Sequence, residues 1–319
     1  MVYEFAPYVG PPPARASILA FLRSRVLDDS RTRPTAPATR TDAGALADEP
    51  TDITVRPISA RAECQACVVL QHEIWGDDDA APASVLQVVA HVGGIVAGAF
   101  AADGELLGFV FGLPALMHGT VAHWSHVLGV RESARNAGVG RMLKEYQRAE
   151  LARRGIARMY WTYDPLVAKN AHLNLNLLGA RVVEYVRDMY GTTASPLHNG
   201  LATDRLIVVC DTGPRPSPRA EPVSRALERC PVLTAEPRPG DVPASMDDGA
   251  RLHTLLLEIP ADFQLLAAQA SDRAERWHAA TRAHFEWALL NGYTVSGLHR
   301  DPVTTRAFYV LEHRPQGAA

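Results

Sequence analysis

The fold is decided by residues 122–141, which read AHWSHVLGVRESARNAGVGR. The first nine residues carry the aromatic and β-branched side chains typical of a strand, and a polar loop follows them. A helix is predicted from about Val139 to Arg154, where Gly155 ends it. Gly138 and Gly140 allow main-chain N–H groups to approach a ligand closely. Together with the free N–H donors and dipole of the helix start, the loop predicts a site for a phosphate or pyrophosphate.

This loop is neither of the two common phosphate motifs. It lacks the Gly-Lys-Ser/Thr end of a P-loop, and it lacks the third glycine of a dinucleotide fingerprint. In a chain with 23 glycines such spacing also arises by chance, so the surrounding elements must carry the interpretation.

Those elements alternate between strands and helices. The predicted strands are residues 53–56, 95–100, 106–111, 122–130, 157–163, 181–186 and 206–210. Asp103-Gly104 predicts a hairpin between the second and third of them. Further helices are expected at 59–74, with Ser59 as the N-cap, and at 169–178, which Gly179 ends. The order indicates an α/β (α+β) fold.

The rest of the chain predicts four parts. Residues 1–50 are a Pro/Ala-rich extension that we expect to be flexible, because they lack apolar side chains for a core. Residues 51–211 form the core. Residues 212–250 are a Pro-rich connector with at most a short helix at 223–229. Residues 251–319 predict a β-α-β-β lobe: strand 252–259, one helix 262–290, and strands 293–298 and 307–311. Such a lobe should dock on the core or on a second copy, as in a homodimer.

Composition narrows the class of protein. In 319 residues, 47% are hydrophobic, 21% are charged and the net charge is -3, which excludes collagen, coiled coils and wholly disordered chains. No overall charge attracts nucleic acid or an acidic membrane, so neither is expected as a partner. Four scattered cysteines favour a cytoplasmic protein.

The uncharged run 80–102 nearly meets the length of a membrane span, but Gly93-Gly94 favours a short helix, a turn and a strand. Residues 14–27 form an amphipathic stretch, either a transit or docking helix or part of an unstructured arm.

With these elements in order, the chain resembles the GNAT superfamily of acyl-CoA N-acyltransferases over about residues 53–210. The resemblance narrows to predicted GNAT acyltransferases, some of them associated with N-succinylamino acid racemases. The segments that narrow it are Ile74-Trp75-Gly76, Gly93-Gly94, 126–130, 161–166, Asn170-Ala171, Asp204-Arg205, 258–263 and Gly292-Tyr293. It implies the GNAT fold, a mixed and mostly antiparallel sheet flanked by helices.

The resemblance also implies acetyl-CoA or succinyl-CoA as the acyl donor, and no metal is expected. The donor's pantetheine arm would pair with the strand and its pyrophosphate would lie on the loop. The implied donor-binding residues are Leu128, Gly129, Val130, Arg135, Asn136, Ala137, Gly138, Val139, Gly140, Arg141 and Asn170. The acceptor would be the primary amine of a small molecule, an amino acid or related metabolite, which attacks the thioester directly.

The chain departs from the GNAT pattern at the residue that would protonate the leaving thiolate. Many members carry a tyrosine four residues before the glycine that ends the last core helix, and Leu175 stands there in this chain. Tyr163, Asn174 or Tyr190 would have to replace it, or water would.

The other catalytic candidates lie on the strand and at two strand ends. His126 is our candidate base because a neutral imidazole suits amine deprotonation, and His123 and Ser125 are alternatives. A regular strand places His123 and Ser125 on one face and His126 on the other, whereas a bulge would reset that alternation. Asp164 either orients a substrate ammonium or caps the next helix. Arg205, with Asn174, is the candidate for binding substrate, and a structural ion pair with a neighbour such as Asp204 is the alternative for Arg205.

Other groupings favour structural roles. Cys64-x-x-Cys67 has zinc or redox spacing without a second pair, and a loop followed by a strand is not expected to place His118, His123 and His126 tetrahedrally. Residues 77–79 are three aspartates typical of a solvated loop, and the last long helix carries Trp277, Phe285 and Trp287 as core anchors.

Two other functions stay open: a non-catalytic acyl-CoA-binding or partner-binding module, and a CoA-thioester decarboxylase.

Overall fold

The computed structural model describes residues 53–76, 80–191, 200–214, 230–239, 241, 244, 246, 252–301, 304 and 306–313. All of them belong to one compact unit, residues 50–319. Three expectations lie outside the described residues: the extension 1–50, the helix at 223–229 and the aspartates 77–79. The exact borders of the connector stay a prediction.

A seven-stranded sheet forms the first half of this unit, in the order β1-β2-β3-β4-β5-β7-β6. Its strands are β1 Thr54–Pro57, β2 Ile95–Phe100, β3 Leu106–Met117, β4 Thr120–Val130, β5 Arg158–Tyr163, β6 Arg181–Val186 and β7 Arg205–Asp211. All neighbours are antiparallel except β4 and β5, which run parallel. The expected mixed, mostly antiparallel sheet is confirmed.

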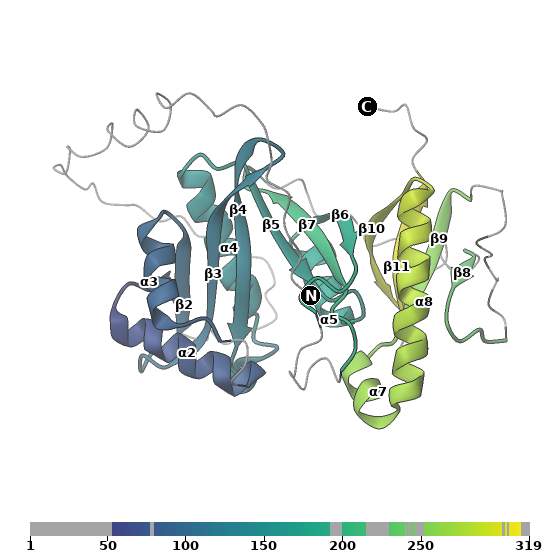
Figure 1. Cartoon of the computed structure of the whole chain (residues 1–319), viewed down its shortest axis with the longest axis horizontal. Helices are drawn as coiled ribbons and strands as arrows, with labels where there is room; N and C mark the ends of the chain where they lie inside the picture. Colours follow the sequence, from purple (N-terminus) through teal and green to yellow (C-terminus); the bar gives the residue numbers. More distant parts are fainter. Residues whose placement is uncertain are drawn as a thin grey trace, which may run out of the picture. The chain divides into compact units, whose positions relative to one another are not determined.

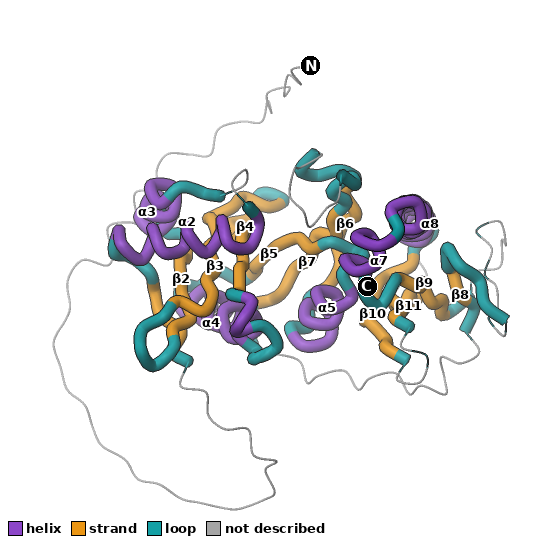
Figure 2. The backbone as a smooth tube through the Cα atoms, turned by 90° about the horizontal axis from the view of Figure 1, so that it is seen from below, coloured by secondary structure: helices purple, strands orange, loops and turns teal. Residues whose placement is uncertain are grey.

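Helices cover both faces of this sheet. The α2 helix (Arg61–Trp75) and the α3 helix (Ala83–His91) lie on one face, and α4 (Val139–Arg153) lies on the other with α5 (Ala168–Ala171) (Figures 1 and 2). A π-helical turn, His172–Leu177, continues α5. The face with α2 and the face with α4 have separate hydrophobic clusters, so each side chain of β4 belongs to one face or the other.

Local sequence explains most element borders. The Asp103-Gly104 turn is confirmed: Gly104 has φ 89°, and Asp103 Oδ1 accepts a hydrogen bond from the Glu105 N–H at 3.0 Å. The predicted N-cap Ser59 is wrong, because Ala60 holds that position without a side-chain cap. The chain stays extended longer than expected, since the Ile58 N–H bonds to the Val96 carbonyl at 2.9 Å.

The uncharged run 80–102 forms α3, a turn at Gly93-Gly94 and β2, as expected. Within the described residues, no helix combines the length and the apolar character that crossing a membrane requires. β2 is buried along its whole length, which explains why its sequence carries no charge.

A second, four-stranded sheet follows, in the order β10-β11-β9-β8. Its strands are β8 Val232–Leu233, β9 Thr254–Ile259, β10 Tyr293–Arg300 and β11 Ala307–His313. The short β8 comes from the predicted connector and pairs in parallel with β9. Its helices are α7 (Phe263–Gln269) and α8 (Ser271–Leu290), so the single helix predicted over 262–290 is wrong. The chain leaves helical geometry at Ala270 (φ -152°, ψ 80°), and the break leaves Phe263 of α7 and Trp277 of α8 both buried.

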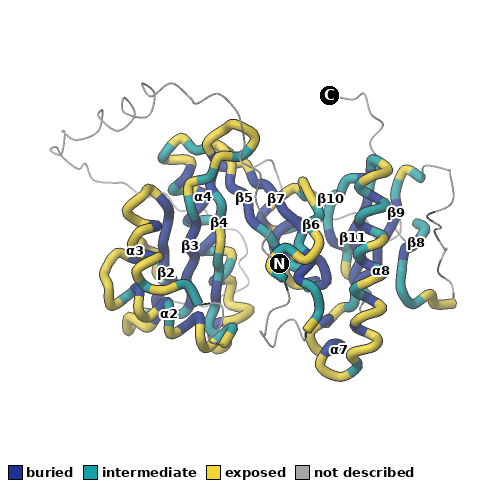
Figure 3. The backbone as a smooth tube through the Cα atoms, viewed as in Figure 1, coloured by how far each residue is buried: buried dark blue, intermediate teal, exposed yellow. Residues whose placement is uncertain are grey.

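The second sheet docks on the first through one shared hydrophobic core. Central strands such as β2, β7 and β9 are largely buried, whereas the edge strands β1 and β6 and much of the helix surface are not (Figure 3). Polar contacts reinforce the docking. The Tyr309 hydroxyl donates to the Pro165 carbonyl at 2.7 Å, and the Asn176 amide bonds to both the N–H and the C=O of Leu298 in β10. Docking on the core is therefore observed, while a homodimer stays a prediction.

Candidate functional site

β4 and β5 separate after two paired residues. His123 pairs with Met159 and Trp124 with Tyr160, and no later pair joins these strands among the described residues. β4 runs on to Val130, while β5 stays paired with β7 along its other edge as far as Tyr163. The two strands diverge in Figure 1. We call this opening the fork: beyond Trp124, one main-chain edge of β4 faces β5 without bonding to it.

A bulge lies at the start of the fork. Phe111 pairs with Val127 and Gly112 with Ser125, so His126 is the extra residue of β4. Its imidazole packs edge-on against Phe111 at 5.4 Å between ring centres, and Val127 packs in the same cluster beneath α2. Two successive side chains thus point to the α2 face, the resetting of alternation that a bulge produces.

The loop after β4 ends in an uncapped helix start. Asn136 (φ 68°) and Gly138 (φ 77°) are left-handed, and Gly138 takes the N-cap position of α4 without a side-chain hydrogen bond. A Cβ on Gly138 would meet no atom within 4 Å. The first-turn N–H groups of α4 therefore have neither a side-chain cap nor a helical partner.

A hollow of about 630 Å³ opens at this loop, lined by Val55, Ala137, Gly138, Arg141, Met142 and Glu145. Arg135 and Arg141 are half-exposed, and each forms a long ion pair of 3.8 Å, Arg135 with Glu132 and Arg141 with Glu145. N–H donors, a helix dipole and two arginines fit a diphosphate. The predicted anion loop is thus open to its surroundings.

The fork leads directly to this loop. A Cβ on Gly140 would lie 3.5 Å from Leu128 and 3.8 Å from Val130, both on the α4 face of β4. The next contact is Leu173 of the π-helical turn at 4.0 Å. Gly140 therefore keeps the first turn of α4 close to the end of β4, so one elongated ligand could contact both.

Gly129 and Asn170 complete the predicted donor-binding set. Gly129 is buried on the α2 face, where a Cβ would come within 2.9 Å of Trp75 and 3.0 Å of Ile74. Its lack of a side chain thus serves the packing of α2 on β4. Asn170 is exposed in α5, on the face of the sheet that carries α4.

The structure places Ser125 and His126 on opposite faces of β4. Ser125 is buried on the α4 face, where its hydroxyl donates to Gln147 Oε1 at 2.7 Å. His126 keeps part of its side chain exposed on the α2 face. Its neighbours still displace enough water to lower its pKa from the ordinary value.

Sequence reasoning missed the buried polar group beneath Ser125. Lys144 of α4 donates from Nζ to Ser125 Oγ at 2.7 Å, and its ammonium lies 4.4 Å from the centre of the Trp161 ring. Gln147 Nε2 lies 3.3 Å from His123 Nε2. Burial lowers the pKa of Lys144 to about 7. Burial, followed by the Lys144 charge, lowers the pKa of His123 to about 4.

A periodicity signal could have found this group. Lys144, Gln147, Arg148 and Leu151 recur at helical spacing, and the structure buries all four. Polar residues on the buried stripe of a helix are expected to form a network.

Asp164 and Arg205 meet where β5 ends and β7 begins. Asp164 Oδ1 accepts the Leu166 N–H at 2.8 Å, and its Oδ2 lies 3.7 Å from Arg205 Nη1. Arg205 also lies 5.4 Å over the ring of Tyr190, and Nη1 donates to the carbonyl of Asp204. The Arg205 ion pair is thus with Asp164, whereas the Asp204 carboxylate binds Arg282.

The candidates for proton donation divide between two environments. Tyr163 is buried beside Tyr309 of the second sheet, and burial raises its pKa further above the ordinary value. Asn174 is buried and accepts the Trp161 indole N–H at 2.9 Å. Leu175 is buried in the shared core. Tyr190 is exposed, with its hydroxyl 3.3 Å from Thr162 Oγ1.

No protein-family model matches the chain, and no curated protein sequence matches it significantly. Solved structures do match. The ribosomal-protein-S18-alanine N-acetyltransferase from Escherichia coli is 16% identical over 52% of this chain and 97% of its own, with a TM-score of 0.41. An aminoglycoside 6'-N-acetyltransferase from Enterococcus faecium is 19% identical over 51% and 99%, with a TM-score of 0.39. Another, complexed with coenzyme A, is 18% identical over 51% and 99%, with a TM-score of 0.38.

These neighbours are acetyltransferases. The likeness concerns the fold over about half of this chain.

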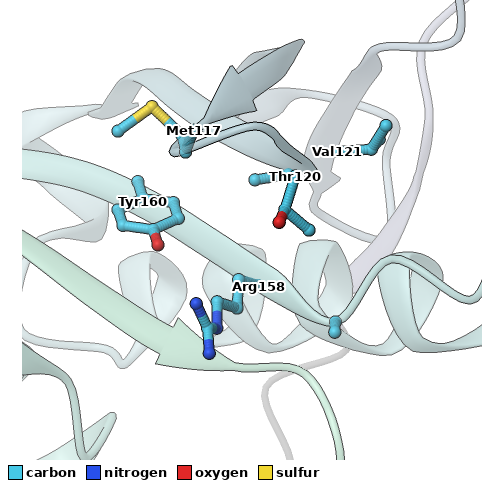
Figure 4. Close-up of a pocket in the computed structure, with 7 residues that line it drawn as sticks. Met117, Thr120, Val121, Arg158 and Tyr160 are labelled. Atoms are coloured by element: carbon cyan, nitrogen blue, oxygen red, sulfur yellow. The ribbon is translucent and has the colours of Figure 1, made fainter.

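A second hollow, of about 180 Å³, lies between the turn of the β3–β4 hairpin and the start of β5 (Figure 4). Met117, Thr120, Val121, Arg158 and Tyr160 line it. The paired residues His123 and Trp124 come between it and the free edge of β4. It therefore lies at the closed end of the fork.

The two cysteines of α2 lie in the packed core. Cys64 and Cys67 are buried in α2, and burial raises the pKa of the Cys67 thiol to about 12, which disfavours a thiolate ligand. Across the described part of the chain, no three His, Cys, Asp or Glu side chains gather as metal ligands. Trp277 and Phe285 are buried in the shared core, with Trp287 packed against it.

Proposed function

We propose that this chain is a CoA-dependent N-acyltransferase that moves an acetyl or succinyl group from acyl-CoA to the primary amine of a small molecule. One observation carries the proposal: the free edge of β4 leads to a glycine-rich, uncapped helix start that borders an open hollow. The pantetheine arm of CoA is extended and carries amide groups that can pair with a free strand edge. The CoA diphosphate is an anion that the N–H groups of the helix start can bind.

In this proposal the chain holds the donor by main-chain groups. Leu128, Gly129 and Val130 offer the strand edge, and the loop 136–141 offers the anion site. Arg135 and Arg141 add positive charge. The bound donor supplies a thioester, and the remaining chemistry falls to the residues at the fork.

His126 is proposed as the base. It stands at the bulge on the α2 face, opposite Ser125, so an amine reaching the fork from that face would meet a neutral imidazole. Main-chain N–H groups freed by the bulge are suitable donors for the developing oxyanion.

The acceptor is proposed to be an amino acid or related metabolite. The pair Asp164–Arg205 offers a carboxylate and a guanidinium 3.7 Å apart, which matches the two charges of a zwitterion. The resemblance to acyltransferases associated with N-succinylamino acid racemases is the reason to include succinyl-CoA among the donors.

The test is a matrix of donors and acceptors. Purified protein is mixed with acetyl-, succinyl- or malonyl-CoA and a panel of amino acids, and free thiol and product mass are followed. Thiol release that requires an amine is the expected result. Donor binding without turnover would indicate the non-catalytic module that Leu175 favours. Loss of carbon dioxide from malonyl-CoA without thiol release would indicate decarboxylation.

A further inference from the structure

Lys144 is an unusual residue in this chain. Among 32 basic residues only two are lysines, Lys144 and Lys169. Lys169 is exposed in α5, whereas Lys144 is buried in α4. An apolar side chain of similar length would fill the same space without the cost of burying an amine. Packing alone therefore gives no reason for a lysine here.

The surroundings of its amine are largely apolar or neutral. Ser125 and His123 face it from β4, the Trp161 ring from β5 and the Cys210 thiol from β7. On α4 itself, Arg148 is committed to the carbonyls of Asp211 and Gly213. The charge of Arg154, at the end of α4, helps to lower the pKa of His123, and Glu145 borders the loop hollow. Burial is the dominant effect on this amine, and it lowers the pKa to about 7.

Within the described residues, the one side-chain hydrogen bond that this amine donates goes to Ser125, at the start of the fork. Ser125 is the first residue of β4 beyond its last pair with β5, and Lys144 Nζ donates to its hydroxyl at 2.7 Å. A donor arm that follows β4 from Val130 towards the closed end of the fork would bring its sulfur end to this residue. Val130 to Ser125 spans about 17 Å of strand.

The usual proton donor is absent from this region. Leu175 replaces the tyrosine that the resemblance leads one to expect, Asn174 is engaged with Trp161, and Tyr163 faces the second sheet. The leaving thiolate needs a proton from some other group on the α4 face.

We propose that Lys144, acting through the Ser125 hydroxyl, delivers the proton that the departing thiolate takes up. This inference rests on the proposed function and assigns one of its proton transfers. As the C–S bond breaks, its electron pair stays on sulfur and takes the Ser125 hydroxyl proton. Ser125 regains a proton from the Lys144 ammonium, which leaves a neutral amine. The proton of the acceptor amine goes to His126, and Lys144 is reprotonated from solvent after the products leave.

Two lysines make a direct measurement feasible. Lysine labelled with ¹³C at Cε gives two resonances, which Lys144→Met and Lys169→Met assign. The Lys144 resonance is titrated in the free protein, with the sulfonate made by oxidising the CoA thiol and with desulfo-CoA, which lacks only the sulfur. The sulfonate is anionic throughout the titration and should raise the Lys144 midpoint by about one to three pH units relative to desulfo-CoA, since a nearby anion favours the ammonium. Lys169 should shift equally with both ligands.

The outcomes separate this inference from the proposed function. If both ligands bind and leave the Lys144 midpoint equal, the inference is wrong and the proposed function stands. If neither binds, both are overturned.

Turnover gives a second readout. Ser125→Ala and Lys144→Met should each lower kcat by about a hundredfold, the scale of one acid or base group, and Ser125→Thr should restore most of it. The fall of kcat above the Lys144 midpoint should disappear in Lys144→Met. A mutant that keeps that alkaline fall would contradict a role for Lys144 in proton delivery.

Discussion

The Arg282 guanidinium binds both carboxylate oxygens of Asp204 at 2.7 Å, so α8 of the second sheet is tied to the start of β7 in the first. The Tyr185 hydroxyl and the Asp188 N–H donate to the same carboxylate. Burial alone would raise the pKa of Asp204, but these hydrogen bonds hold it below the ordinary value. The stabilisation is therefore present at neutral pH and is lost as the pH falls through the lowered pKa.

Asp204→Asn should lower the free energy of unfolding by about 3 kcal/mol at pH 7, because it leaves Arg282 without its buried partner. The loss should shrink as the pH falls, since Asp204 itself becomes protonated. Urea unfolding at pH 7 and pH 3 measures both effects. Glu286→Gln is the control, since its partner Arg187 is exposed and the loss should be much smaller. Equal losses for both variants would contradict the assignment.

Lys144→Met should change how stability depends on pH. The folded pKa of Lys144 is about 7 and its reference value is 10.5, so between these values the unfolded chain binds one more proton. Stability should accordingly rise with pH across this window, by about 1.4 kcal/mol per pH unit from this group. The rise should be absent in Lys144→Met and present in Lys169→Met. Parallel curves for wild type and Lys144→Met would show that the amine is not titrating in this range.

Gly138→Asp should weaken CoA binding by more than tenfold, about 1.4 kcal/mol, while the protein stays folded. The new carboxylate would stand at the helix start where phosphate is expected, and the left-handed backbone adds strain. Gly155→Asp is the matched control, since Gly155 has φ 72° and equally open surroundings at the other end of α4. Calorimetric titration with CoA compares the two. Unchanged affinity in Gly138→Asp would remove this loop as the anion site.

His126→Gln should lower kcat/KM by about a hundredfold. In wild type the rate should rise with pH through a midpoint below 6.5, because the pKa of His126 is lowered and only the neutral imidazole accepts a proton. That rise should vanish in His126→Gln. A variant that keeps the same acidic limb would exclude His126 as the base.

Arg205→Gln should raise KM for an amino acid acceptor about ten- to a hundredfold, the scale of one charge-assisted hydrogen bond. KM for the amine that lacks only the carboxylate should change little. Steady-state kinetics with such a pair of acceptors separates binding from folding, because a structural defect would affect both equally.

Local patterns were enough to predict the β2–β3 hairpin and α4, since Asp103-Gly104 and Gly155 act on their own neighbours. The break at Ala270 was not predicted from the sequence, because one apolar stripe continues across it through Phe263, Ala267, Ala274 and Trp277. β8 was not predicted either, because Val232-Leu233 lies among prolines and takes its strand geometry from pairing with β9.

At the candidate site, the sequence indicated the anion loop and left the roles of Asp164 and Arg205 open. Their pairing depends on strands that meet only in the folded chain. Lys144 was missed because a lysine beside Glu145 suggests a solvated helix face.

Asn176 donates one hydrogen bond to Leu298 and accepts another from it, which ties the π-helical turn after α5 to an edge strand of the second sheet. Anything that pushes α5 outward must also shift β10 or break both bonds. The second sheet therefore braces the π-helical turn whose Leu173 lies against Gly140, and shortening the chain before β10 would leave that turn unsupported.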